Sequence, residues 1–349
     1  MLALSPPELL DLLKTLPPDR TAFVWGPPGI GKSALVRAAG EELGLPCVVL
    51  LGTQIAPEDL IGVPRIRELS PGRFATEFCP PGAILRSTPF LLFVDELNSA
   101  VPDVQKAFYS LILDRRLGDY ELPPASRVVA AGNRVEDRAL VRPMATALAN
   151  RMVHVALEPN ADAWLAWATG AAVHPLVLAF IRARPDRLCE TPPSDATPAY
   201  PTPRAWHMLS DAIAATGTRL WPALAAGSVG DRAGAEFAAF AVRALDAPTL
   251  EAVARGDAPV PRDPELIYFL GASCLARLAS RSKEDGELAA KVVIALGGVS
   301  KEVAVWAVDA ALSQGQASPA VAAFESVLRT SGAQTLAHVL RLSRYARES

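Results

Sequence analysis

One stretch of eight residues constrains the fold of this chain more than any other. Residues 26–33 read Gly-Pro-Pro-Gly-Ile-Gly-Lys-Ser, which is the G-x-x-x-x-G-K-[ST] pattern of a phosphate-binding loop. An apolar, β-prone run precedes the loop at 21–25, and good helix formers follow it at 34–39. The pattern requires this context, because backbone N–H groups at a helix N-terminus must face the phosphates. We predict that Lys32 reaches the β- and γ-phosphates and that the Ser33 hydroxyl binds Mg²⁺.

A second apolar run, at 88–94, ends in two acidic residues, Asp95 and Glu96. Taken alone, such a pair often marks only a helix N-terminus, where the helix dipole favours negative charge. Downstream of a complete phosphate loop, a catalytic interpretation is favoured instead. We predict that Asp95 holds the Mg²⁺ shell and that Glu96 orients and deprotonates the attacking water.

Two further polar side chains follow apolar or turn-forming segments. Asn133 comes at the end of a buried strand predicted at 127–132. Its amide can bind both the γ-phosphate and the water, although an asparagine there can also simply tolerate a left-handed turn. Arg204 follows Thr202 and Pro203, a suitable N-cap and first helical residue. A cation is not favoured in the first turn of a helix, so Arg204 is a candidate for contact with an anion.

Composition limits the classes of protein that remain. A chain of 349 residues is expected to form two or three domains. A net charge of −3 and the lack of a Lys/Arg cluster argue against nucleic acid as the main partner. We expect neither a membrane span nor a signal peptide, because no long apolar run and no basic start occur. The four cysteines are scattered, which favours reduced thiols in the cytoplasm over disulfides or a zinc site.

The order of elements predicts an α/β fold at the N-terminal side. Apolar strands alternate with helices up to residue 157, which is typical of a doubly wound parallel sheet with its ligand at the strand C-termini. The run at 46–51 is expected to be buried on both faces. Hairpins are predicted at 61–78 and at 115–122, the second turning over Gly118-Asp119. The first is either a surface decoration or a moving element that contacts a substrate or partner.

From residue 160 onward the chain is predicted to be all helical, interrupted by a Pro-rich loop at 191–201. Beyond residue 160, helical patterns occupy 161–187, 203 onward, 231–245, 248–255, 264–280, 284–296, 300–313 and 318–346. Before residue 160, helices are predicted at 5–15, 104–113 and 144–150, and the first of them has a capping box of Ser5 and Glu8.

With these motifs in this order, the chain resembles an AAA+ ATPase and, within that superfamily, looks most like the MoxR branch. The segments that carry the resemblance are GPPGIGKS at 26–33, FLLFVDELNSA at 90–100, AAGNR at 130–134, ALANRMVHV at 147–155 and Thr202-Pro203-Arg204. The two predicted hairpins are similar to insertions of the same clade. The family usually has Asp-Arg-Phe where this chain has Asn150-Arg151-Met152.

The resemblance implies ATP hydrolysis with Mg²⁺ and assigns roles to residues of this chain. ATP would be bound by Gly26, Pro27, Pro28, Gly29, Ile30, Gly31, Lys32, Ser33 and Ala34, the last through its backbone N–H only. Asn133 would sense the γ-phosphate, and Arg204 would contact it from the lid of the same subunit. Arg151 would act in trans on the ATP of a neighbouring subunit, so the family implies a homo-oligomeric ring, usually a hexamer.

The resemblance also implies a domain plan and partners. We expect a P-loop AAA+ core at 1–158, an all-α lid at 159–255 and a C-terminal helical region at 256–349. MoxR relatives remodel or mature client proteins, commonly with a von Willebrand factor A-type partner. Two alternatives stay open: a nucleic-acid-directed AAA+ motor or restriction-type nucleotidase, and a nucleotide-gated scaffold that does not hydrolyse ATP.

Overall fold

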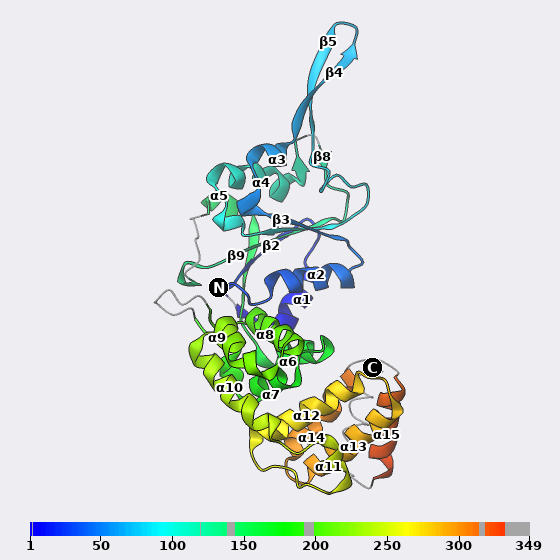
Figure 1. Ribbon diagram of the computed structural model, residues 1–349. Coiled ribbons are helices and arrows are strands. Elements are labelled where there is room, and N and C mark those ends of the chain that lie inside the picture. Colours follow the sequence, from blue (N-terminus) through cyan, green and yellow to red (C-terminus); the bar gives the residue numbers. More distant parts are fainter. Residues whose placement is uncertain (2, 119, 138–143, 192–198, 314–317, 332–349) are drawn as a thin grey trace. The chain divides into compact units, whose positions relative to one another are not determined.

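The computed structural model describes residues 1–349 except 2, 119, 138–143, 192–198, 314–317 and 332–349. These residues form two compact units, Met1–Pro159 and Asn160–Ser349 (Figure 1). Three features of the sequence prediction lie outside the described residues. They are Asp119 in the second hairpin, most of the Pro-rich loop at 191–201 and the end of the helix at 318–346.

The first unit is built on a six-stranded sheet in the order β1-β10-β2-β9-β6-β3, in which all neighbours are parallel. The strands are β1 (Ala3–Leu4), β2 (Thr21–Trp25), β3 (Cys47–Leu51), β6 (Leu91–Asp95), β9 (Arg127–Gly132) and β10 (Met152–Leu157). The predicted P-loop fold with a parallel sheet is therefore confirmed. Strand β1 was not predicted, because two residues are too short to show a pattern.

Helices cover both faces of this sheet (Figure 1). One face packs against α1 (Pro6–Thr15) and α2 (Lys32–Glu42), and the other against α3 (Pro57–Ile61), α4 (Pro102–Asp114) and α5 (Thr146–Ala149). Helix α1 begins as predicted: the Glu8 carboxylate accepts hydrogen bonds from the Ser5 backbone N–H at 2.8 Å and from its hydroxyl at 2.6 Å. The central strands β2, β6 and β9 are almost wholly buried, as a sheet covered on both faces requires.

Strand β3 departs from the prediction that it is buried on both faces. It is the last strand of the sheet, and the Val49 side chain is 38% exposed. The prediction is wrong here because an apolar run shows only that a segment is hydrophobic. The strand's place at the edge depends on the order of the sheet, which the run does not contain.

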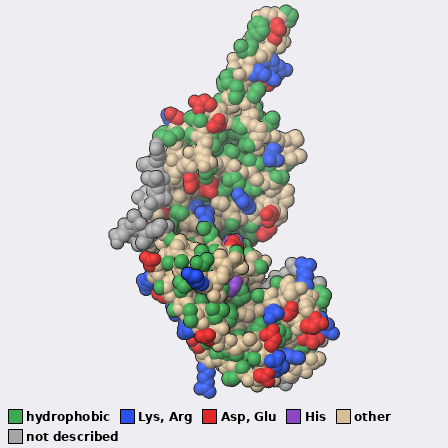
Figure 2. Space-filling model, in the orientation of Figure 1, with side chains coloured by type: hydrophobic (Ala, Val, Ile, Leu, Met, Phe, Trp, Pro, Cys, Tyr) green, Lys and Arg blue, Asp and Glu red, His purple; other side chains and the backbone are tan. Residues whose placement is uncertain are grey.

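Two hairpins interrupt the alternation of strands and helices, as predicted. The first pairs β4 (Val63–Ser70) with β5 (Arg73–Cys79) and extends away from the rest of the first unit (Figures 1 and 2). Ile66 and Phe74 project from the same face of this ribbon and are 76% and 65% exposed. The second hairpin is short and pairs β7 (Arg116–Leu117) with β8 (Tyr120–Glu121).

The second unit consists of helices throughout its described residues. They are α6 (Ala161–Gly170), α7 (Pro175–Ala183), α8 (Pro203–Ala215), α9 (Trp221–Val229), α10 (Asp231–Leu245), α11 (Leu250–Arg255), α12 (Pro264–Leu278), α13 (Lys283–Gly297), α14 (Lys301–Ser313) and α15 (Pro319–Thr330). The helical pattern at 161–187 divides at Ala172, whose φ of 54° ends the first helix before Pro175 opens the next. Helix α9 was not predicted.

Two buried apolar clusters lie in this unit, one mainly within α6–α10 and one mainly within α11–α15. The first surrounds the aromatic rings of Phe180, Trp206, Phe237 and Phe240, all fully buried. The expected boundary between a lid at 159–255 and a region at 256–349 stays a prediction. No helix among the described residues is both long enough and apolar enough to cross a bilayer.

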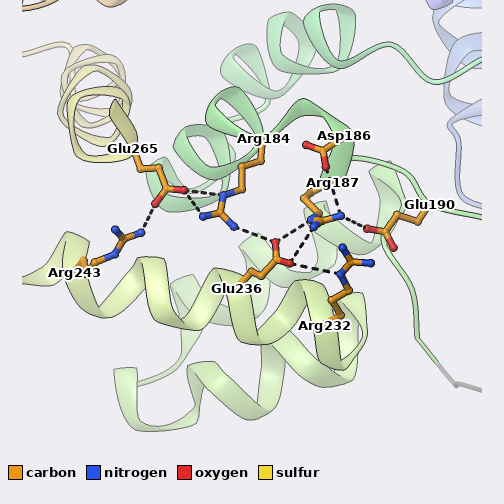
Figure 3. A network of polar contacts seen from close by, with 8 residues as sticks. All are labelled: Arg184, Asp186, Arg187, Glu190, Arg232, Glu236, Arg243 and Glu265. Carbon is orange, nitrogen blue, oxygen red and sulfur yellow. Dashed lines mark hydrogen bonds and ion pairs between the residues drawn. The ribbon is translucent and has the colours of Figure 1, made fainter. Parts of the chain in front are cut away.

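A network of alternating charges joins the turn that follows α7 to α10 and α12 (Figure 3). The Glu236 carboxylate accepts two hydrogen bonds from Arg187, at 2.8 and 3.0 Å, and one from Arg184 at 3.0 Å. Arg184 also donates to Glu265 at 2.7 Å, and Glu265 pairs with Arg243. The hydrogen bonds from Arg187 lower the pKa of Glu236. Charge pairs in a network of this kind hold neighbouring helices in one orientation more firmly than isolated surface pairs do.

Candidate active site

The phosphate loop connects the end of β2 to the start of α2. Gly29 and Gly31 have φ angles of 78° and 107°, in the left-handed region that glycine adopts without strain. Gly31 is the N-cap of α2, so the helix begins at Lys32. Pro27, Pro28 and Ile30 complete the turn, Ile30 with its side chain buried, and Ala34 follows in the helix. The loop therefore has the strand–turn–helix geometry that places a helix N-terminus beside an anion.

The Lys32 side chain is folded back over the loop and is only 7% exposed. Its Nζ atom donates to the backbone carbonyl of Gly26, to that of Pro27 at 3.1 Å and to Oδ1 of Asn133 at 2.8 Å. A buried ammonium needs partners of this kind, because its charge is otherwise costly to desolvate. Two of the predicted site residues, far apart in the chain, are thus in direct contact.

The Ser33 hydroxyl donates to Oδ2 of Asp95 at 2.8 Å. The other carboxylate oxygen of Asp95 accepts the backbone N–H of Glu96 at 3.0 Å. A hydroxyl and a carboxylate side by side fit Mg²⁺, which prefers oxygen ligands and takes most of them from water and phosphate. Among the described residues, no group of three or more His, Cys, Asp or Glu side chains could hold a metal. A Mg²⁺ ion at Ser33 and Asp95 would take its further ligands from water and from nucleotide phosphates.

Glu96 follows β6 with a φ of 55°, so the backbone turns sharply after Asp95. Its Oε2 atom accepts a hydrogen bond from the Thr53 hydroxyl at 3.0 Å. Thr53 follows β3, the neighbour of β6 in the sheet, and was not predicted as a site residue. The available signal was a polar residue just after a predicted strand, which is where parallel strands present side chains to a ligand.

Asn133 follows β9 directly, and its backbone is held by a second residue that sequence reasoning missed. The Nδ2 atom of Asn98 donates to the Asn133 carbonyl at 2.8 Å, and Asn98 is almost fully buried. Gly132 leaves room for this contact, because a Cβ atom there would lie 2.0 Å from Oδ1 of Asn98. Asn98 is part of the segment at 90–100, but its contact with Asn133 appears only in three dimensions.

The two predicted arginines do not join this cluster in the same way. Arg151 lies between α5 and β10, is exposed, donates to the Ala147 carbonyl and stacks 5.3 Å from the Tyr109 ring centroid. Arg204 belongs to the second unit, in the first turn of α8, where the Thr202 hydroxyl accepts the Ala205 N–H at 3.1 Å as predicted. The structure thus brings Lys32, Ser33, Asp95, Glu96 and Asn133 together at the carboxyl ends of β2, β6 and β9.

The fold and this cluster define a P-loop nucleotide-binding domain. Comparison with known families is more specific: residues 21–152 match the family model described as "AAA domain (dynein-related subfamily)". The first unit of this chain therefore contains an AAA domain of the dynein-related type.

Individual relatives are more distant. The proteasome-activating nucleotidase of Methanoculleus marisnigri is 25% identical over 156 residues, which cover 41% of this chain and 34% of that protein. The chain thus spans about a third of this relative. Among solved structures, the Thermotoga maritima RuvB branch migration motor is 15% identical, with 74% of this chain and 79% of that chain covered and a TM-score of 0.37. Brucella abortus NtrX, in complex with ADP, is 14% identical, with 78% and 65% covered and a TM-score of 0.40.

Proposed function

We propose that this protein binds ATP and Mg²⁺ at the phosphate loop and hydrolyses the nucleotide to ADP and phosphate. The observation that carries the proposal is the convergence of Lys32, Ser33, Asp95, Glu96 and Asn133 at one edge of the sheet. An ammonium group, a hydroxyl, two carboxylates and an amide lie there together, and enzymes of phosphoryl transfer use this combination of groups. The AAA domain matched at residues 21–152 supports the same reaction.

Each residue has a role that follows from its position. On binding ATP, the Lys32 ammonium leaves the Gly26 carbonyl and the Asn133 amide oxygen and contacts phosphate oxygens instead. Its partners are then negatively charged rather than neutral. Ser33 and Asp95 would hold Mg²⁺, which when bound would neutralise charge on the phosphates. Glu96 accepts a proton from the attacking water, and its bond with Thr53 sets the orientation of the carboxylate. Asn133 orients the water and the γ-phosphate.

We further propose that the active form is a ring, most simply a hexamer, in which Arg151 completes the site of the neighbouring subunit. An exposed arginine outside its own chain's cluster suits a finger supplied in trans. Such a finger contributes about 10³ to 10⁵ in rate, or roughly 4–7 kcal/mol of barrier. In this proposal the chain consists of a core at 1–158, a lid at 159–255 and a C-terminal helical region at 256–349. Arg204 acts from the lid on the γ-phosphate bound by the same subunit.

The biological role that fits best is that of a MoxR-like cytoplasmic remodeller of a client protein, acting with a von Willebrand factor A-type partner. The resemblance of the segments at 26–33, 90–100, 130–134 and 147–155 to the MoxR branch supports this proposal. The extended β4–β5 hairpin offers a surface through which such a machine can contact a client.

ATP turnover by the 349-residue chain tests the proposed reaction. We expect Mg²⁺-dependent hydrolysis by the unmodified protein and nucleotide binding without hydrolysis by Glu96→Gln, which keeps the shape of the side chain but not its basicity. The Lys32→Ala variant serves as the control that loses binding. Rapid hydrolysis by Glu96→Gln would remove Glu96 from its role as base. Stimulation by DNA would instead favour a nucleic-acid-directed motor.

A further inference from the structure

A histidine connects the strand before the phosphate loop to the segment that carries Arg151. The indole N–H of Trp25 donates to Nδ1 of His154 at 2.9 Å, and Nε2 of His154 lies 2.8 Å from the carbonyl oxygen of Ala149. Because an indole N–H can only donate, Nδ1 must be the acceptor and Nε2 must carry the proton. Both ring nitrogens are therefore used, and the imidazole is held in one orientation.

The ring stack around His154 gives this contact a defined geometry. His154 pairs with Phe23 across β10 and β2, and its ring lies 5.5 Å from that of Phe23. The Trp25 ring is stacked on that of His154 at 6.0 Å with an angle of 22° between the planes. Phe23 and Trp25 are in turn 4.4 Å apart. The three rings therefore form one packed group, in which Phe23 is fully buried and Trp25 and His154 are half-buried.

Both ends of this hydrogen-bonded line reach residues of the proposed reaction. Trp25 is followed at once by Gly26, whose carbonyl accepts a hydrogen bond from Lys32. Ala149 is the last residue of α5, and Arg151 comes two residues later, with its own N–H bonded to the Leu148 carbonyl at 3.1 Å. When Lys32 turns to bind phosphate, the Gly26 carbonyl loses that partner, and Trp25 is the adjacent residue.

We propose that Trp25 and His154 are positioning residues that transmit the state of a subunit's own phosphate loop to Arg151. This inference rests on the proposed function, in which Arg151 serves the neighbouring subunit. The Trp25–His154–Ala149 line then links two ATP sites: the loop of one subunit and, through Arg151, the site of the next. Nucleotide binding in one subunit thereby positions Arg151 of that subunit at the ATP site of its neighbour. Hydrolysis in adjacent subunits is therefore coupled.

The Trp25→Phe variant tests the proposal most directly, because it removes the indole N–H donor and keeps an aromatic ring for the stack. Trp221→Phe is the matched control: Trp221 also donates through its indole, to the Thr216 carbonyl at 3.4 Å, but lies in the second unit. We expect Trp25→Phe to lower kcat about three- to thirtyfold and to abolish cooperativity, with little change in nucleotide affinity. Trp221→Phe should change neither quantity.

A double-mutant cycle distinguishes transmission from a general structural role. If Trp25 acts through Arg151, adding Trp25→Phe to Arg151→Ala should cause no further loss of turnover. A purely structural effect would lower stability in both backgrounds and would reduce turnover additively. Additive losses, with normal turnover by the unmodified protein, would overturn the proposal while leaving the proposed function intact.

Hydrogen–deuterium exchange with a bound ATP analogue tests the proposal even if the protein does not hydrolyse ATP. Addition of a non-hydrolysable ATP analogue should slow hydrogen–deuterium exchange at residues 146–152 of the unmodified protein but not of Trp25→Phe. Equal protection in both would refute the transmission. If the analogue does not bind the unmodified protein at all, both the proposed function and this inference are wrong.

Discussion

The Nζ atom of Lys32 and the Oδ1 atom of Asn133 lie 2.8 Å apart, although 101 residues separate them in the chain. The contact joins the residue proposed to bind phosphate to the residue proposed to sense it. Replacing Asn133 by Ala should leave nucleotide binding within a few-fold and lower kcat by about 10²-fold, the usual effect of removing one preorganised donor. Equilibrium titration and steady-state kinetics separate the two quantities. An equal loss in affinity and kcat would show that Asn133 acts in binding instead.

The Thr53 hydroxyl is the side-chain partner that we expect to hold Glu96 in place. Thr53→Val keeps the side-chain shape but removes the donor, so kcat should fall about tenfold, as for a hydrogen bond to a charged group at a partly exposed position. Thr53→Ser retains the hydroxyl and is the matched control, with turnover near that of the unmodified protein. Full turnover by Thr53→Val would mean that Glu96 needs no such partner.

Arg151 can be tested by complementation between two inactive variants. Arg151→Ala should bind ATP but lose about 10³-fold or more in turnover. Glu96→Gln should be inactive for a different reason. In mixed rings, a site with an intact Glu96 can face an intact Arg151 from its neighbour, so mixing should restore measurable hydrolysis. No recovery, under conditions where subunits demonstrably exchange, would argue against action in trans.

Gly132 allows the close approach of Asn98 to the backbone beside Asn133. In Gly132→Ala the new methyl would lie 2.0 Å from Oδ1 of Asn98, so the structure must shift, and we expect a loss of about 1–3 kcal/mol in stability. Gly82→Ala, where nothing lies within 4 Å of the added Cβ, is the control for the entropy change of the unfolded chain. Thermal unfolding of both variants measures the difference, and equal melting temperatures would contradict the geometry.

The charge network around Glu236 should make stability depend on pH. Hydrogen bonds from Arg187 lower the pKa of Glu236 below its ordinary value of 4.5. A lowered pKa in the folded state means that the stabilisation is present above the unfolded value and is lost as pH falls through the folded one. The difference in melting temperature between the unmodified protein and Glu236→Gln should therefore shrink as pH falls below about 4.5. Glu251→Gln, which removes one exposed ion pair, should show little effect at any pH.

Sequence reasoning identified the parts of the candidate site whose pattern is local. Lys32 and Ser33 belong to a contiguous motif, and Asp95 and Glu96 directly follow an apolar run. Their proximity follows from the rule that parallel strands present their carboxyl ends at one edge.

The residues that were missed act through contacts between segments distant in the chain. Thr53 is meaningful only because β3 lies beside β6, and Asn98 only because Gly132 has no side chain. The same holds for Trp25 and His154, which look like ordinary strand residues until β2 and β10 are paired. In the second unit, helices were predicted from composition, yet α9 and the break at Ala172 depend on tertiary packing and backbone conformation.

The position of β3 at the end of the sheet has a consequence for handling this protein. At the opposite end, β1 has only two residues and offers little backbone for pairing. Strand β3 presents five, Cys-Val-Val-Leu-Leu, none of them charged, and no strand of the described residues pairs with its outer side. An uncharged, apolar edge of this kind is a template for strand addition by another chain. We therefore expect the protein to be prone to aggregation through this strand, and Val49→Lys, which places a charge at its exposed position, should lower light scattering at high protein concentration.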